Sequence, residues 1–479
     1  MTILFPKTIH RLILIFLVLL CSTTIIAEMD NHVPMGWAAV PTSVGREPSS
    51  GVNVEGTIGG GDGRVVTASG GDLAKYASSK EPLVIMAEGS FSGNIKIAAH
   101  KTIIGTGSGS TLRGGFAIGS NVIIRNFKVS GGVDGMQVSG NSSIWIDHCD
   151  LSACGDGLLD ITNGSDKITV TWVRFSNHHK TMLINKGNKG GTDDTDRNKV
   201  TIIHNWFDGS RTRNPRVGYG KVQILNNYYV NNGYAIHTFW NAQVVIERNY
   251  FKGVSDAVSD HGGSTPGSWP GPGYVVLIDN YTTNPGSIQK KTTSDPNKIF
   301  HIEKYYMYDW VVTKDVQKVP EVVQNGAGTG SEWGKIGAIP TPGQGFAQVG
   351  TNPTLKWTKV GSQASNKVYF GTTNPPPEAA TVDGYNYKPG QLKEGTVYYW
   401  KINDGDIWKF RTKGEIATNS KRPVLSKSNA IKRIAPIQKI NVLGKSGNYI
   451  GIKNDNNDRL YFLNGKEVLN KKIPKKAVK

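Results

Sequence analysis

The stretch KVTIIHNWFDGSRTRNPRVGYGKVQILNNYY, residues 199–229, contains one short pattern twice. Each copy alternates apolar residues with other residues, continues with polar residues and ends on two aromatic residues. This alternation, bounded by Gly, Asn, Ser and Asp, is typical of a short β-strand with one buried face. The first apolar positions of the copies, Val200 and Val222, are 22 residues apart.

The same pattern recurs in the neighbouring chain, where six segments align. Their first apolar positions are separated by 22, 24, 32, 22 and 22 residues: Val122, Ile144, Ile168, Val200, Val222 and Val244. A repeat near 22 residues, with little helical pattern between copies, predicts an all-β fold, a parallel β-helix in which each copy forms one coil. Equivalent positions then stack, so these six residues should form an apolar column.

Two polar features follow from the same stacking. Asn205, Asn227 and Asn249 occupy one position of the repeat and predict an Asn ladder along the axis. We place Cys149 in that column one coil earlier, as a buried free thiol. Cys149 and Cys154 are too few for a disulfide framework.

The chain has 479 residues, which favours more than one domain. Lys7 and Arg11 precede an apolar run over 12–20, and small residues end near Ala27. This predicts a secretory signal peptide over residues 1–27 and a secreted, extracellular protein. No later apolar run approaches the length of a membrane span, and we expect none.

The formal charge of +18 is concentrated in the C-terminal tail. Residues 414–479 carry 15 Lys or Arg and 4 Asp or Glu, which accounts for +11 of the +18. Because the main body is only mildly basic, the charge does not favour nucleic acid as a partner. The tail could instead hold the protein near an acidic polymer or simply be solvated.

One position of the repeat collects charged residues. Asp134, Asp156 and Lys180 each lie twelve residues after a column position, and Arg213 lies thirteen after Val200. Neighbouring strands are about 4.8 Å apart, so these side chains should lie within reach of one another. Asp160, four residues beyond Asp156, should point to the same side of an extended strand.

The residues alone leave two interpretations of this charged row open. It could be a surface ladder of complementary charges, in which each pair adds little stability. The three carboxylates, however, would repel one another unless a cation lay among them. Oxygen ligands without His or Cys suit a hard ion, and Ca²⁺ better than Zn²⁺.

At these residues the chain resembles the pectate lyases, a polysaccharide lyase family of right-handed parallel β-helices. The resemblance extends from about residue 45 to about residue 330. The matching pieces are DGMQV at 134–138, IWIDH at 144–148, DGLLDI at 156–161, HHKTMLI at 178–184 and RNPRVGYGKVQILNNYY at 213–229.

The resemblance implies a role for each charged residue. Asp134, Asp156 and Asp160 match the family's Ca²⁺ ligands, Lys180 its substrate-carboxylate lysine and Arg213 its catalytic base. The substrate would be polygalacturonate, cleaved by β-elimination to 4,5-unsaturated products. Because a guanidinium is ordinarily protonated, and neighbouring positive charges disfavour that form, an alkaline optimum is expected.

One position departs from the family pattern. The family often has a further substrate-binding arginine five residues after the base, where this chain has Gly218. Arg216 would supply substrate-binding charge instead. The alternatives are a pectin lyase acting on methyl esters without calcium, a polygalacturonase, which would need paired carboxylates around a water, and a non-catalytic pectin-binding β-helix.

The C-terminal third has a different pattern. Short alternating strands with aromatic residues follow a Pro/Gly segment and resemble a fibronectin type III-like β-sandwich, usually a spacer or binding unit. We expect a monomer with the following parts: a signal peptide at 1–27, the β-helix at 28–338, a linker at 339–347, a β-sandwich at 348–413 and a Lys-rich segment at 414–479 with a possible small β unit.

Overall fold

The computed structural model describes residues 33–44, 51–185, 196–260, 273–284, 287, 299–359 and 365–414, with the backbone of 449–453, 459–463 and 466–468. The signal peptide expected over residues 1–27 and most of the Lys-rich segment lie outside the described residues. Within the described ranges, no helix has the length and apolar character needed to cross a membrane.

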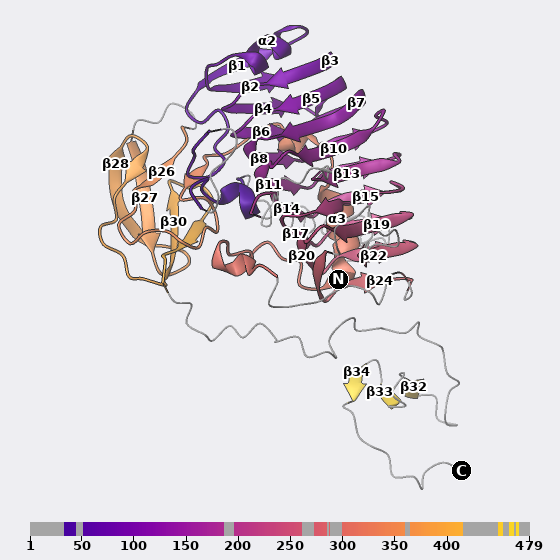
Figure 1. The fold of residues 1–479 in the computed structure, drawn as a ribbon. Coiled ribbons are helices and arrows are strands. Elements are labelled where there is room, and N and C mark those ends of the chain that lie inside the picture. The colour runs from indigo at the N-terminus through magenta and orange to yellow at the C-terminus, as the bar shows by residue number, and fades with distance from the viewer. Residues whose placement is uncertain are drawn as a thin grey trace, which may run out of the picture. The chain divides into compact units, whose positions relative to one another are not determined.

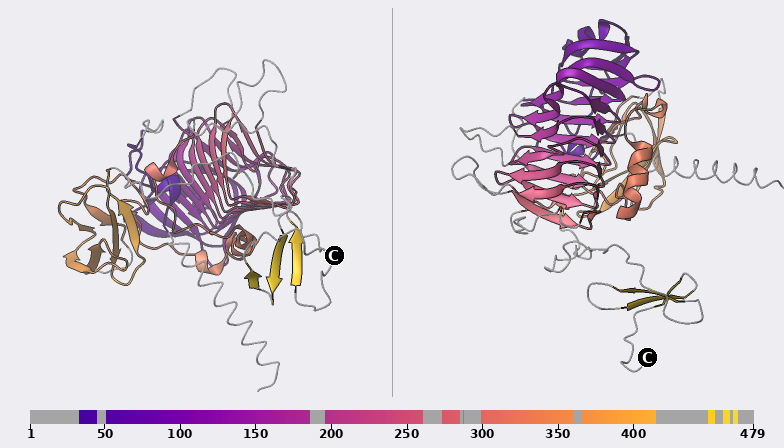
Figure 2. Two further views of the ribbon diagram at one scale, coloured as in Figure 1. Left: turned by 90° about the horizontal axis from the view of Figure 1, so that it is seen from below. Right: turned by 90° about the vertical axis from the view of Figure 1, so that its right-hand side faces the viewer.

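The coils of residues 64–282 stack on one another as the repeat predicts (Figures 1 and 2). Within the described residues, one wall is a ten-stranded sheet in which every neighbouring pair is parallel. Its strands, in order, are β1 (Arg64–Ala68), β2 (Leu83–Ala87), β4 (Lys101–Gly105), β6 (Val122–Arg125), β8 (Ser142–Asp147), β11 (Asp166–Thr171), β14 (Lys199–Ile203), β17 (Lys221–Leu225), β20 (Gln243–Glu247) and β23 (Tyr274–Ile278).

A second sheet, of fourteen strands among the described residues, forms two further faces. The β10 face contains β3 (Ser90–Ile97), β5 (Ser110–Ile118), β7 (Phe127–Ser139), β10 (Gly157–Thr162), β13 (Lys180–Ile184), β16 (Arg216–Gly218), β19 (Tyr234–Phe239) and β22 (Asp256–Asp260). The β12 face contains β9 (Asp150–Ser152), β12 (Arg174–Ser176), β15 (Trp206–Asp208), β18 (Tyr228–Val230), β21 (Tyr250–Lys252) and β24 (Tyr281–Thr282). The long strand β7 joins the faces, because its first half pairs with β9 and its second half with β10.

The predicted apolar column is confirmed. Val122 pairs with Ile144, and the register continues without a break to Val244 and then Val275. The members of this column are buried, so each coil stacks its core on the previous one.

The Asn ladder is also confirmed. The amide of Asn205 donates to Asn227 Oδ1 over 3.0 Å, that of Asn227 to Asn249 Oδ1 over 2.9 Å, and Asn280 extends the row. Cys149 is buried and free, but its predicted level was wrong. Val173 occupies the coil between, where its N–H donates to Asn205 Oδ1 over 2.9 Å, so Cys149 lies two coils before Asn205.

The corner between the first sheet and the β12 face has a recurring backbone conformation. The residue four positions after each column residue has a positive φ, as at His148 (44°), Trp172 (54°) and His204 (56°). Their rings stack, with centroids 5.8 and 4.3 Å apart, and Trp333 covers His148 at 3.8 Å. The His148 ring is therefore packed between aromatic side chains.

Helices are few among the described residues and lie outside the coils. They are the α-helices α2 (Asp72–Ser78) and α3 (Val319–Gly326) and the 3₁₀ turns η1 (Gly36–Ala39), η3 (Ile302–Lys304), η4 (Val316–Lys318) and η5 (Ser331–Trp333). The segment around η1 lies against the first sheet, because Trp37 N–H donates to Thr201 Oγ1 and Ala38 N–H to Thr169 Oγ1.

The C-terminal third forms two small antiparallel sheets. One contains β25 (Pro340–Thr341), β26 (Leu355–Trp357) and β29 (Asn386–Tyr387). The other contains β28 (Glu378–Asp383), β27 (Ser365–Gly371), β30 (Val397–Ile402) and β31 (Trp408–Arg411). The likeness to fibronectin type III stays a prediction.

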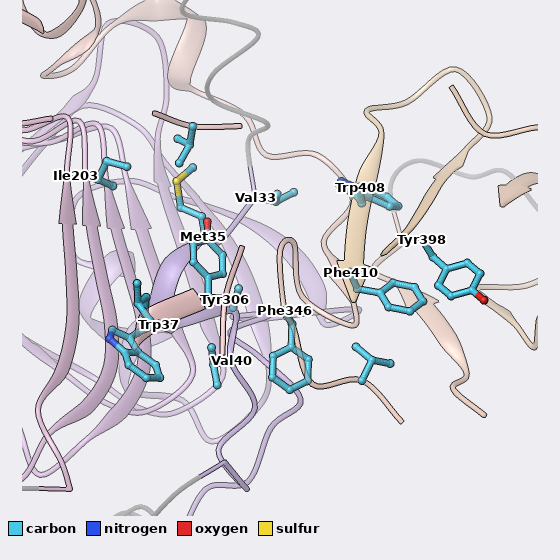
Figure 3. Close-up of a cluster of buried hydrophobic side chains, with 14 of the residues drawn as sticks. Val33, Met35, Trp37, Val40, Ile203, Tyr306, Phe346, Tyr398, Trp408 and Phe410 are labelled. Atoms are coloured by element: carbon cyan, nitrogen blue, oxygen red, sulfur yellow. The ribbon is translucent and has the colours of Figure 1, made fainter. Parts of the chain in front are cut away.

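The Pro/Gly segment 339–347 is more than a linker. Its strand β25 pairs with β26, and Ile339, Phe346 and Ala347 are buried. Figure 3 shows Phe346 between Trp37 and Tyr306 on one side and Phe410 on the other, in one buried cluster. The small sheets and the β-helix therefore share a core.

Residues 431–479 form a separate unit. Its described backbone contains three antiparallel strands in the segment where a small β unit was expected: β32 (Tyr449–Lys453), β33 (Arg459–Leu463) and β34 (Lys466–Val468).

Candidate active site

The residues of the charged row come from consecutive coils at one edge of the β10 face. Asp134 lies within β7, Asp156 just before β10, Lys180 at the start of β13 and Arg213 just before β16. The backbone N–H of Asp156 donates to the Val133 carbonyl over 2.6 Å, which places Asp156 beside Asp134. Residue counting thus predicted which coils supply the row.

The register shifts by one residue within this row. Lys180 pairs with Gly157 and not with Asp156. The sequence predicted the pair Asp156 and Lys180, because each lies twelve residues after a column position. The reason is one extra residue in the chain between Asp156 and Leu159, since Leu159 pairs with Met136. The shift leaves Gly157 N–H free to donate to Asp134 Oδ1 over 2.9 Å.

Asp156 and Lys180 form a half-exposed ion pair. Lys180 Nζ lies 2.6 Å from Asp156 Oδ1, and His178 Nε2 lies 2.6 Å from the Asp156 carbonyl oxygen. The pKa of Asp156 is lowered, chiefly by the Lys180 hydrogen bond and further by the charges of Lys180, Arg213 and His178. Asp156 is therefore a carboxylate across the neutral range.

Asp160 has the opposite electrostatic character. Its Oδ1 is buried and has no hydrogen-bond partner within the described ranges. Burial raises the pKa of Asp160 to about 6, and the carboxylates of Asp134 and Asp156 act in the same direction. A Cβ at Gly157 would lie 2.4 Å from Asp160 Oδ1, so glycine is what leaves room for this carboxylate.

The same side chains include the expected Ca²⁺ ligands Asp134, Asp156 and Asp160. In the described part of the chain, no three His, Cys, Asp or Glu side chains are gathered closely enough to hold a metal ion as they stand. Asp156 is paired with Lys180 instead. The donor set still fits a hard cation, since it consists of carboxylate oxygens, one of which is buried and has no partner among the residues that the structure describes.

Arg213 follows Lys180 on the next coil. Its φ is +60°, and its carbonyl accepts a hydrogen bond from Met182 N–H over 2.7 Å. The guanidinium is half-buried and forms no ion pair or hydrogen bond with the residues that the structure describes. Its charge acts on both Asp156 and Asp160, so the row is one electrostatic unit.

Arg216 and Gly218 have surroundings that counting could not predict. The Arg216 guanidinium lies over the Phe239 ring, 4.7 Å from its centroid, and burial lowers the pKa of Arg216. A Cβ at Gly218 would lie 2.7 Å from the Phe239 ring. The space that an arginine at 218 would need is therefore taken by an aromatic side chain.

Sequence reasoning missed Gln137 in this site. Its Nε2 donates to Asp134 Oδ2 over 3.3 Å, and its Cα partner on the next coil is Asp160. The available signal was its position fifteen residues after Val122, on the outward side of the same strand as Asp134.

Fold and site together define a parallel β-helix protein with acidic and basic side chains clustered on four successive coils. A family model described as Pectate lyase matches residues 53–330, more than half of the chain. The chain belongs to the pectate lyase family and is an enzyme of that kind.

Curated relatives agree with this assignment. Pectate lyase plyB of Emericella nidulans is 37% identical over 221 residues, covering 42% of this chain and 67% of that protein. The pectate trisaccharide-lyase of Thermotoga maritima is 32% identical over 219 residues, covering 42% and 58%. Among solved structures, Bsp165PelA of Bacillus sp. N165 in complex with trigalacturonate is similar, with 24% identity, a TM-score of 0.47 and coverage of 62% and 99%.

Proposed function

We propose that this protein is a secreted, Ca²⁺-dependent pectate lyase that cleaves polygalacturonate by β-elimination. The observation that carries the proposal is the buried Asp160 Oδ1, which has no hydrogen-bond partner among the described residues. It lies among two further carboxylates and next to the Arg213 guanidinium, which makes no ion pair with the part of the chain that the structure describes. An unpartnered buried carboxylate oxygen is costly, and such a cost is expected where a ligand completes the site.

Asp134, Asp156 and Asp160 would hold the ion. When bound, Ca²⁺ supplies positive charge that offsets repulsion between the protein and substrate carboxylates and makes the proton on C5 of the uronate more acidic. Asp156 would then exchange its partner Lys180 for the ion, which leaves the ammonium available to the substrate.

The side chains of this chain perform the remaining steps. Lys180 pairs with a uronate carboxylate and orients the sugar, with Arg216 as a second cation near the chain. Arg213 takes the proton from C5, the C–H electron pair forms the C4–C5 double bond, and the C4–O bond breaks. The departing oxygen takes a proton from solvent, and Arg213 returns its proton to water.

The pectate substrate is supported by the names of the relatives, which include pectate lyases and pectate trisaccharide-lyases. Secretion is supported by the pattern over residues 1–27. A fibronectin type III-like role for residues 348–413, as a spacer or a binding unit, remains part of the proposal, as does a monomeric state.

A pectin lyase is the second candidate, and one observation favours it. Phe239 fills the space beside Gly218 where a further cation would bind an acidic sugar. An apolar ring at this position suits a methyl ester better than a carboxylate. The three aspartates favour the calcium-dependent reaction.

Ultraviolet absorbance of unsaturated product tests the proposal. The parent protein, Arg213→Ala and the control Arg174→Ala would be assayed on polygalacturonate and on methylated pectin, with and without a chelator. Arg174 pairs with Asp208 on the β12 face, away from the charged row. We expect product from the parent and the control only, and its loss with chelator. Chelator-resistant cleavage of methylated pectin would instead establish the second candidate.

A further inference from the structure

A cleft of about 400 Å³ lies where the strands β3, β5 and β7 end on the β10 face. The side chains that matter for its chemistry are Val52, Lys96, Ala117, Gln137 and Ser139. Apart from Gln137, which lies in the motif DGMQV at 134–138, none of these residues belongs to the sequence motifs or to the proposed catalytic residues, and we name the site the Lys96 cleft.

The register of the sheet connects the Lys96 cleft to the charged row. Lys96 pairs with Ala117, Ala117 with Gln137, and Gln137 with Asp160. The same column continues through Leu183 to Arg216. Since neighbouring strands are about 4.8 Å apart, Lys96 lies about 14 Å from Asp160 along this column.

The lining of the cleft matches an acidic sugar. Among the described residues that line it, Lys96 is the one with a charged side chain. Lys96 is exposed and makes no ion pair or hydrogen bond with the described residues, so its ammonium is available. Gln137 and Ser139 add an amide and a hydroxyl, while Ala117 and Val52 offer small apolar surface for the carbon face of a sugar ring.

Gln137 belongs to both places. It lines the Lys96 cleft and donates to Asp134 Oδ2 over 3.3 Å. A ligand that contacts Gln137 from the Lys96 cleft therefore lies one side chain away from the Asp134 carboxylate. One polymer chain can contact both the Lys96 cleft and the charged row.

We propose that the Lys96 cleft is a further subsite for the polysaccharide, in which Lys96 pairs with the carboxylate of a galacturonate residue a few sugars from the cleaved bond. This inference rests on the proposed function, because it assumes that polygalacturonate lies along the β10 face. It adds that the enzyme should favour long acidic chains over short ones.

Chain-length dependence tests the subsite. We would compare Lys96→Ala, Ala117→Trp, which fills the cleft, and the control Lys128→Ala on trigalacturonate and on long polygalacturonate. Lys128 is an exposed lysine on the half of β7 that pairs with β9. Removing a charge-assisted contact should lower kcat/KM on the long substrate about tenfold, through KM, and leave the trisaccharide rate unchanged. Thermal unfolding of each variant would confirm that it is folded.

Binding gives a second measurement that does not need turnover. In an Arg213→Ala background, calorimetry should show that Lys96→Ala weakens binding of long oligogalacturonates and not of trigalacturonate. Equal losses at all lengths, or no loss in either variant, would overturn the subsite. An equal loss for a neutral galactan of the same length would overturn its specificity for acid. Absence of unsaturated product from the parent would refute the proposed function separately, and absence of any binding would refute both.

Discussion

Asp147 and Asp160 lie on the coil that begins near Ile144, and each has a buried carboxylate oxygen, but their surroundings differ. Asp147 Oδ1 accepts a hydrogen bond from Thr171 over 2.5 Å, and its Oδ2 contacts His148 at 2.8 Å and Arg125 at 3.2 Å. Asp160 Oδ1 has no hydrogen-bond partner among the described residues. The fold thus supplies partners for both oxygens of the Asp147 carboxylate, whereas Asp160 Oδ1 would gain a partner only from a ligand.

The difference shows how the same coil serves two purposes. Burying a charge is tolerated when hydrogen bonds and an opposite charge compensate it, as around Asp147. Around Asp160, burial raises the pKa of the carboxyl to about 6, and the charges of two further carboxylates act in the same direction. The first cluster should therefore control stability, and the second should control activity at the expense of stability.

The largest effect should come from removing the base. Arg213→Ala should lower the rate of unsaturated product formation roughly 10²- to 10⁴-fold, the usual range for general base catalysis, and leave the unfolding transition unchanged. Initial rates and circular dichroism would check this. Retention of the parent rate would mean that another group removes the proton.

The next largest effect should appear in the Asp147 cluster. Asp147→Asn leaves the buried Arg125 without its carboxylate and should destabilise the protein by about 3–5 kcal/mol in chemical denaturation. Asp208→Asn, which breaks the more exposed Arg174 pair, should cost less than about 1 kcal/mol. Equal costs would contradict the distinction between compensated buried charges and surface pairs.

Asp160→Asn should stabilise the protein, in contrast to Asp147→Asn. In the presence of a chelator at neutral pH it should stabilise the protein, by up to about 3 kcal/mol, because a pKa raised from 3.8 to about 6 makes the ionised form costly. In the parent, the stability that Asp160 contributes should be fully present below pH 3.8 and should be lost as pH rises to about 6. The gap between variant and parent should open across that window, while activity is lost.

Asp150→Asn is a matched control for that experiment. Asp150 Oδ2 accepts from both the N–H and the hydroxyl of Thr329, so the substitution should destabilise. A stabilising Asp150→Asn or a destabilising Asp160→Asn would remove the physical basis of the comparison.

Lys180→Met should have only a small effect on stability. Its ion pair with Asp156 is half-exposed, and such pairs contribute less than about 1 kcal/mol. The variant should unfold like the parent but bind oligogalacturonate more weakly. Lys367→Met, which removes an exposed pair with Glu378 in the C-terminal sheets, should change neither property.

Much of the fold could be predicted from the sequence, because residues one repeat apart become neighbours on successive coils of a β-helix. The column from Val122 to Val244 and the ladder from Asn205 to Asn249 followed from spacing. The level of Cys149 was wrong because the repeat through Ile168 was left out of the count. The offset at Lys180 was one residue off because a single extra residue in a strand carries no periodic signal.

By itself, the sequence determined which coils stack and which charged residues share an edge, since backbone pairing between successive coils follows chain length per turn. Only the tertiary structure decided that Asp160 keeps a buried oxygen with no hydrogen-bond partner in the described part of the chain and that Phe239 fills the space beside Gly218. It also decided that the segment around Trp37 joins the β-helix core to the C-terminal sheets. These outcomes depend on how side chains from distant segments fill volume and shield charge, and no repeat in the sequence records that.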